Sequence, residues 1–426
     1  MTAIAEAPVV ARTVLPPIAK KLPITLSIAT VLFGALFLLV PRHGTAVFRL
    51  DDGTTALKIP DWSVSADVVI AVVSVILVLL TIWSWFAALR RISAGKWVPI
   101  VFAVLAVFAF VTWAAADANG QVPVVNMLYG SISLAVPLAF GALGGVIGER
   151  AGVVNVAIEG QLLLGAFLGA VFGTLAHNPF FGLLGSMIGG MLVAFVLAAF
   201  AIKYLVEQVI VGVVLNVLVA GLTAFLFTIL LVPNSETLNN TPQFDKIKIP
   251  LISEIPVIGP VLFNQNLIVY LLYITVPVVA FSLYRTRWGL RVRAVGEYPR
   301  AADTVGIKVN PTRFWNVMLA GALAGIGGAY YTLVSVPHFN RDMTNGAGFI
   351  ALAAVIFGRW DPVRATLAAL LFGFATNLQN TFSAIGTPVP GEFLLMLPYV
   401  VTLIAVVGFV GQIKAPAADG KPYIKS

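Results

Sequence analysis

Residues 141–161 read GALGGVIGERAGVVNVAIEGQ, a glycine-rich apolar run that contains three charged side chains and one asparagine. Two candidate membrane spans, 124–148 and 153–176, meet within it. Ionisable groups are costly inside a bilayer and are rare there unless they have a function. A helix that breaks at this depth frees backbone groups, which a membrane tolerates only where they line a cavity or are buried in protein. The stretch therefore predicts a discontinuous helix near 141–165.

The composition of the whole chain is that of a membrane protein. Of its 426 residues, 59% are hydrophobic and only 10% are charged, and the mean hydropathy is +0.98. Soluble domains carry about 25% charged residues, so these charges could not cover the surface of soluble domains. This excludes a soluble enzyme, a disordered chain and a nucleic-acid binder. The absence of cysteine excludes disulfides, thiolate metal sites and a cysteine nucleophile.

Apolar runs near the length of a bilayer crossing recur along the chain. A helix needs about 20 mostly apolar residues to cross the hydrocarbon core. We expect an all-α integral membrane protein, a polytopic bundle of about 10–12 transmembrane helices. The shortest run, 345–358, is expected to be re-entrant or packed inside the protein. The candidate spans are 24–40, 65–89, 97–115, 124–148, 153–176, 180–202, 208–232, 266–284, 313–334, 345–358, 364–382 and 391–411.

The runs divide the chain into three regions. Residues 1–120 form an N-terminal extension with about three predicted helices, residues 121–411 a denser core, and residues 412–426 a tail. Glycines at four-residue spacing in 185–190 and 321–328 predict faces on which helices pack closely. Trp360, like six other tryptophans, lies near a predicted span end and is expected in an interfacial belt.

The distribution of charge orients the bundle. The segment 285–313 carries seven basic and two acidic residues, whereas the polar gap 233–265 carries two basic and three acidic residues. Cytoplasmic loops are enriched in lysine and arginine. We therefore expect 285–313 to be cytoplasmic, 233–265 to be external, and both termini to be cytoplasmic. The net charge of +8 then needs no nucleic-acid partner.

Five polar side chains are candidates for a solute path or its gate. Asn155 and Glu159 are four residues apart and would share one helix face. The same residues could instead belong to a capped helix start beside a cytoplasmic loop, and Asn216 could tie two helices together. The candidates for the path or gate are Glu149, Arg150, Asn155, Glu159 and Asn216.

The cytoplasmic segment predicts a short surface helix over 300–305. Pro299 suits a first helical turn, where its missing N–H has no cost, and Gly306 is a suitable stop. Such a helix could dock on another protein, or the segment could be a solvated connector. No phosphate-binding loop G-x-x-x-x-G-K-[ST] occurs, so an ATPase that drives this protein would be a separate chain. Serine-hydrolase and zinc motifs are also absent.

Four blocks, in this order, resemble ABC-transporter permeases of the bacterial nucleoside importer type. They are ALGGVIGERAGVVNVAIEG (142–160), AVGEYPRAADTVG (294–306), GFIALAAVIFGRW (348–360) and KPYIK (421–425). That type belongs to the permease superfamily that includes ribose and branched-chain amino acid importers. The resemblance covers roughly residues 124–426, and the extension 1–120 departs from it.

The resemblance implies that the chain forms half of a translocation path and performs no covalent chemistry. The implied partners are a paralogous permease in a heterodimer, a cytoplasmic ABC ATPase, an extracytoplasmic substrate-binding lipoprotein and the lipid bilayer of a bacterial plasma membrane. This chain would bind no cofactor, because ATP and Mg²⁺ would bind to the ATPase. The implied ATPase contact comprises Glu297, Pro299, Arg300, Ala301, Ala302, Asp303 and Gly306.

Two alternatives use the same residues differently. An ion-coupled secondary transporter would use an intramembrane carboxylate such as Glu159 as its coupling site. The same ABC role could also serve a sugar. Genes for an ATPase, a paralogous permease and a binding lipoprotein beside this one would favour the ABC importer.

Overall fold

The computed structural model describes residues 20–425 except 52, 54–57, 96, 117, 119–120, 388–390, 394–395 and 397–413. The chain divides into two compact units, one of residues 1–47 and 63–120 and the other of residues 48–62 and 121–426. The candidate span 391–411 lies almost entirely outside the described residues.

The smaller unit is a bundle of three apolar helices, α1 (Lys21–Leu39), α2 (Ala66–Leu89) and α3 (Trp97–Ala115). Polar groups join α1 to α2, because the Trp85 indole N–H donates to Ser27 Oγ at 2.8 Å. Only 22% of the α1 span and 28% of the α2 span are buried, so most of their apolar surface faces outward. A helix that is apolar on its exposed side suits lipid as its surroundings.

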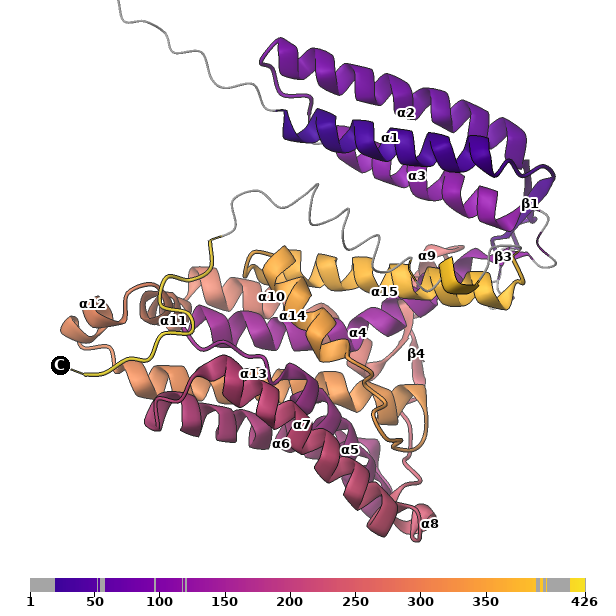
Figure 1. Ribbon diagram of the computed structural model, residues 1–426. Coiled ribbons are helices and arrows are strands. Elements are labelled where there is room, and N and C mark those ends of the chain that lie inside the picture. The colour runs from indigo at the N-terminus through magenta and orange to yellow at the C-terminus, as the bar shows by residue number, and fades with distance from the viewer. Residues whose placement is uncertain are drawn as a thin grey trace, which may run out of the picture. The chain divides into compact units, whose positions relative to one another are not determined.

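The larger unit contains the remaining helices (Figure 1). The long ones are α4 (Val124–Arg150), α5 (Ile158–Ala176), α6 (Pro179–Ala198), α7 (Gln208–Leu226), α10 (Leu267–Arg285), α13 (Val309–Tyr330) and α15 (Pro362–Ala384). The short ones are α8 (Ser235–Leu238), α9 (Ile258–Phe263), α11 (Arg287–Glu297), α12 (Pro299–Thr304), α14 (Ala347–Phe357) and the 3-10 turn η3 (Ile252–Glu254). Wider π-helical turns continue α6, α7 and α13 as η1 (Ala199–Lys203), η2 (Phe227–Leu231) and η4 (Tyr331–Ser335).

Strands are few and short. They are β1 (Thr45–Arg49), β2 (Trp62–Ser65), β3 (Val122–Pro123), β4 (Lys246–Lys248) and β5 (Asn264–Asn266). Strand β1 pairs in parallel with β3, with Phe48 opposite Val122. Strands β4 and β5 form an antiparallel pair with Lys246 opposite Asn266.

The fold confirms the all-α polytopic prediction. Within the described part of the chain, nine helices are long and apolar enough to cross a membrane, and α15 adds another helix of 23 residues. The span of α4 and that of α13 with η4 are each 78% buried, which makes them the central helices of the larger unit. The predicted discontinuity is present too, because α4 ends at Arg150 and α5 begins only at Ile158.

Glycines let the central helices approach closely. A Cβ atom on Gly190 of α6 would clash with the carbonyl oxygen of Gly321 in α13. One turn along, a Cβ on Gly325 would clash with the carbonyl oxygen of Ser186. The predicted packing faces at 185–190 and 321–328 are therefore in direct backbone contact, as small residues allow.

Candidate functional site

The break between α4 and α5 is buried, and side chains satisfy its exposed backbone groups. Asn216 of α7 accepts from the Gly160 N–H at 2.9 Å and donates to the Val156 carbonyl at 2.8 Å. Gln208, at the start of α7, accepts from the Val154 N–H at 2.8 Å. A membrane-embedded backbone without its helical partners needs such contacts. The sequence around Asn155 thus folds as a non-helical linker that is held by α7.

Asn155 bonds from the break to the start of α5. Its side-chain amide is fully buried and pairs with that of Gln161, with N–O distances of 3.0 Å and 3.2 Å in the two directions. Each amide provides one donor and one acceptor to the other, a pairing that suits a buried site. The helix-face prediction for Asn155 and Glu159 is wrong, because Asn155 lies before the first residue of α5.

Helix α5 starts part-way along α4. A Cβ atom on Gly141 would lie 3.0 Å from Ile158, and one on Gly145 would lie 3.2 Å from the same side chain. These glycines precede the end of α4 by nine and five residues, or about 8–14 Å at 1.5 Å per residue. The linker therefore runs back alongside α4, from its end at Arg150 toward Gly141, before α5 begins.

Glu159 lies at the meeting point of two helix starts. One carboxylate oxygen accepts from the Thr344 hydroxyl at 2.6 Å and the Gly346 N–H at 2.9 Å, and the other accepts from the Gly348 N–H at 2.6 Å. Helix α14 begins at Ala347. The first N–H groups of a helix lack intrahelical partners, and negative charge is favourable there. Glu159 therefore caps α14 from the first turn of α5.

Helix α14 is the short run expected at 345–358. It packs one face inside the unit, where Ala351, Ala354 and Val355 are buried, whereas Phe349, Ile350 and Ile356 are exposed. Its 11 residues extend about 16 Å at 1.5 Å per residue, half of a hydrocarbon core of about 30 Å. The extent of the apolar run predicted a short helix. It did not predict the capping carboxylate of Glu159, which is 185 residues away from Thr344 in the sequence.

Glu149 and Arg150 hold the turn between α14 and α15. The Trp360 indole N–H donates to Glu149 Oε2 at 2.5 Å, and Arg150 Nε donates to the Trp360 carbonyl at 2.9 Å. Trp360 and Arg359 both have positive φ, 55° and 56°, a costly conformation for such residues. Trp360 is only 6% exposed, so the expectation of an interfacial belt position is wrong for this residue.

The five predicted path residues thus gather around one break. Their polar groups bond mainly to α7, α14 and the turn after α14, and these contacts organise the break. Their assignment to the solute path or its gate stays a prediction. The sequence did not point to Gln161, Gln208, Thr344 and Trp360, which complete the network.

The predicted surface helix is present as α12, with Pro299 in its first turn. Gly306, at φ +83°, follows it, as expected for a helix stop. Arg300 and Ala301 are exposed, whereas Ala302 is buried. The preceding helix α11 reaches the break, because a Cβ on Gly296 would clash with the carbonyl oxygen of Arg150. The end of α11, directly before α12, is therefore in contact with the end of α4.

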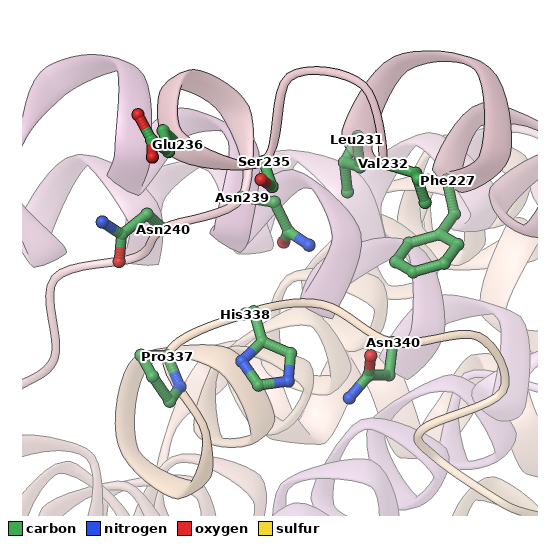
Figure 2. Close-up of a pocket in the computed structure, with 10 residues that line it drawn as sticks. All are labelled: Phe227, Leu231, Val232, Ser235, Glu236, Asn239, Asn240, Pro337, His338 and Asn340. Atoms are coloured by element: carbon green, nitrogen blue, oxygen red, sulfur yellow. The ribbon is translucent and has the colours of Figure 1, made fainter.

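A pocket lined by both polar and apolar residues lies between α8, with the loop after it, and the loop 337–340 (Figure 2). Its volume is about 460 Å³, within the range of ligand pockets. Beside the pocket, Asn239 bonds to the Phe339 backbone, with N–O distances of 2.7 Å and 3.1 Å. The pocket is lined by Phe227, Leu231, Val232, Ser235, Glu236, Asn239, Asn240, Pro337, His338 and Asn340.

Residues 127–406 match the protein family described as a branched-chain amino acid transport system permease component. The chain belongs to this permease family. It is a multi-pass membrane protein and a transport subunit. Among its described residues, no cluster of three or more His, Cys, Asp or Glu could hold a metal ion.

Two relatives within the permease family are similar over nearly their whole length, and a third over about three quarters of it. The guanosine ABC transporter permease protein NupQ of Bacillus subtilis is 40% identical over 301 residues, 68% of this chain and 94% of the relative. The nucleoside ABC transporter permease protein NupC of Lactococcus lactis is 39% identical over 319 residues, 72% of this chain and 98% of the relative. The putative glucose permease TsgC13 of Haloferax volcanii is 36% identical over 60% of this chain and 77% of the relative. No solved structure matches the chain.

Proposed function

We propose that this chain is a permease subunit of an ATP-driven ABC importer for nucleosides in a bacterial plasma membrane. The observation that carries the proposal is the 40% and 39% identity to two permeases named for guanosine and nucleosides, over 94% and 98% of their lengths. The relative named for glucose is less similar and is covered over 77% of its length. A sugar is therefore the second candidate solute.

The permease would work with three partner chains. A second permease is supported by the less similar relative NupB, which occurs in the same Lactococcus strain as NupC. A cytoplasmic ATPase would bind ATP and Mg²⁺ and dock on α12 and its flanks, at the residues from Glu297 to Gly306. A substrate-binding lipoprotein would deliver the solute to the external side, where the segment 233–265 and the pocket that it helps to line would lie. Both termini would be cytoplasmic.

The contacts of the break suggest how α12 would influence the path. Movement of α12 would pass through α11 to Arg150, where Gly296 lies against the end of α4. From there the linker leads to Glu159, which holds the start of α14. Packed elements that have two discrete arrangements can carry coupling between distant sites. The break would thus transmit the state of the ATPase to helices inside the membrane.

Uptake in cells that lack this gene tests the proposal. Labelled guanosine, other purine and pyrimidine nucleosides, ribose and glucose would be offered at equal concentration, with the gene restored on a plasmid as the control. The proposal predicts that nucleoside uptake returns with the plasmid and is lost when the ATPase is inactivated. Uptake that survives loss of the ATPase but collapses with an uncoupler would instead favour an ion-coupled transporter.

A further inference from the structure

The C-terminal tail, which we define as residues 414–425, lies against the cytoplasmic segment that contains α12. The Ala418 N–H donates to the Gly296 carbonyl at 2.9 Å, and the Ala417 N–H donates to the Glu297 carboxylate at 3.2 Å. Figure 1 shows this last part of the chain in yellow beside α11 and α12. The tail therefore forms backbone contacts with the end of α11, directly before α12 begins.

Arg313 in the first turns of α13 anchors the tail. Its side chain is almost wholly buried, and its guanidinium donates to the Lys421 carbonyl at 2.8 Å and the Ala418 carbonyl at 3.4 Å. A buried charge is costly unless it is well hydrogen-bonded. The same contact reaches the break, because a Cβ on Gly152 would lie 2.7 Å from Arg313 Nη2 and 3.2 Å from the Ala418 carbonyl oxygen.

Tyr423 joins the tail to α12 itself. The ring is 8% exposed and packs in a cluster with Val295 of α11, Ala302 of α12 and Val309 of α13. Ala302 is the one fully buried residue of α12, so its packing depends on this cluster.

Helix α12 has six residues, too few to be stable without tertiary contacts. The tail supplies several of those contacts and leaves the opposite face free, where Arg300, Ala301 and Thr304 are exposed. The tail contacts Glu297 and Ala302 of the predicted ATPase contact and leaves Arg300, Ala301 and Thr304 accessible to a partner.

We propose that the C-terminal tail is a positioning segment that fixes α12 against α11, α13 and the α4–α5 break, so that the docked ATPase can move the break. This inference rests on the proposed function, because it assumes that α12 is the docking site. Arg313 and Tyr423 act as positioning residues through the tail and need not touch the solute or the ATPase.

Variants of Tyr423 test the proposal in the full-length protein. Tyr423→Ala removes the ring, Tyr423→Phe keeps the ring and removes the hydroxyl, and Ile424→Ala alters a neighbour that is 69% exposed and serves as the matched control. Amide hydrogen exchange over residues 299–306 is measured in the purified permease. Co-purification with the ATPase and nucleoside uptake are measured in the assembled importer at equal membrane levels.

Tyr423→Ala should raise exchange over 299–306 by about tenfold, because the cluster that packs α12 is lost. It should also lower uptake by about tenfold, within the range by which coupling changes when connecting residues are altered. Tyr423→Phe should recover most of both, and Ile424→Ala should behave as wild type. Arg313→Lys is a second variant, which keeps the charge and loses the paired carbonyl contacts. It should raise exchange and lower uptake as Tyr423→Ala does.

Unchanged exchange in Tyr423→Ala and Arg313→Lys would overturn the proposal, because the tail would then not hold α12. Raised exchange with normal ATPase co-purification and normal uptake would overturn it as well, because positioning would have no consequence. The wild-type importer could fail to take up any nucleoside while the variants still show the expected changes in exchange and co-purification. That result would refute the substrate assignment and support the role of the tail.

Discussion

Replacing Glu159 with alanine should free the start of α14 and the turn that precedes it. The carboxylate accepts from three donors, the Thr344 hydroxyl and the Gly346 and Gly348 N–H groups, at 2.6–2.9 Å. A buried donor left without a partner costs about 1–3 kcal/mol. Glu159 is partly exposed, so water can replace some of these bonds. We expect the local opening free energy to fall by about 2–4 kcal/mol, below the simple sum for three donors.

Hydrogen exchange of peptides that cover 344–350, in detergent-purified protein, measures this change directly. A loss of about 2–4 kcal/mol corresponds to exchange faster by about 30-fold or more. Glu159→Gln keeps one acceptor oxygen and should fall between alanine and wild type. Glu207→Ala is the control for a local cap, because Glu207 caps its own helix α7 through the N–H groups of Val209 and Ile210 and is exposed to solvent.

The same variants separate capping from solute contact. If exchange over 344–350 in a folded Glu159→Ala protein equals that of wild type, the capping argument is wrong. If Glu159→Gln transports every nucleoside as wild type does, Glu159 does not line the path.

Three further predictions concern the break, the packing faces and the tail. Asn216→Ala leaves the Gly160 N–H and the Val156 carbonyl without their partner, and it should destabilise the purified protein by about 2–4 kcal/mol in thermal or denaturant unfolding. Gly190→Ala forces α6 and α13 apart, because its Cβ would clash with a carbonyl oxygen, and it should lower the yield of folded protein in size-exclusion chromatography, whereas Ala substitution at open Gly221 should not. Burial, followed by the nearby Glu149, raises the pKa of Asp419 from 3.8 to about 8. The folded state therefore binds the proton of the Asp419 carboxyl more tightly than the unfolded state does. The contribution of this proton to the free energy of unfolding is complete below about pH 4 and is lost as pH rises through about 8. Exchange over the tail should therefore increase from about pH 4 to about pH 8 and level off above it, after correction for intrinsic exchange. Asp419→Asn should remove this pH dependence.

Much of the fold followed from simple patterns in the sequence. Apolar runs of the right length predicted the spans, and charged and glycine residues in 141–161 predicted where a helix would be interrupted. Pro299 and Gly306 predicted the bounds of α12 closely, because capping preferences act through a few neighbouring residues. These features depend on local chemistry, which a single sequence displays.

The contacts of the break could not be predicted in the same way. Gln208 and Asn216 satisfy its backbone from α7, at separations of 54 to 60 residues. Trp360 bonds to Glu149 from 211 residues away, so its position near a span end suggested a lipid interface instead. Which long-range partners meet depends on how the helices pack, and periodicity within one helix carries no information about its neighbours.

ATP-driven uptake by the reconstituted importer tests the central claim most directly. The chain, its partner permease, the ATPase and the binding lipoprotein would be placed in proteoliposomes with ATP on the ATPase side, and labelled guanosine on the other. We predict accumulation of guanosine that requires ATP hydrolysis, requires this chain and is reduced by unlabelled nucleosides but not by glucose. ATP-dependent accumulation of glucose without guanosine, or guanosine entry that needs an ion gradient and no ATP, would contradict the account.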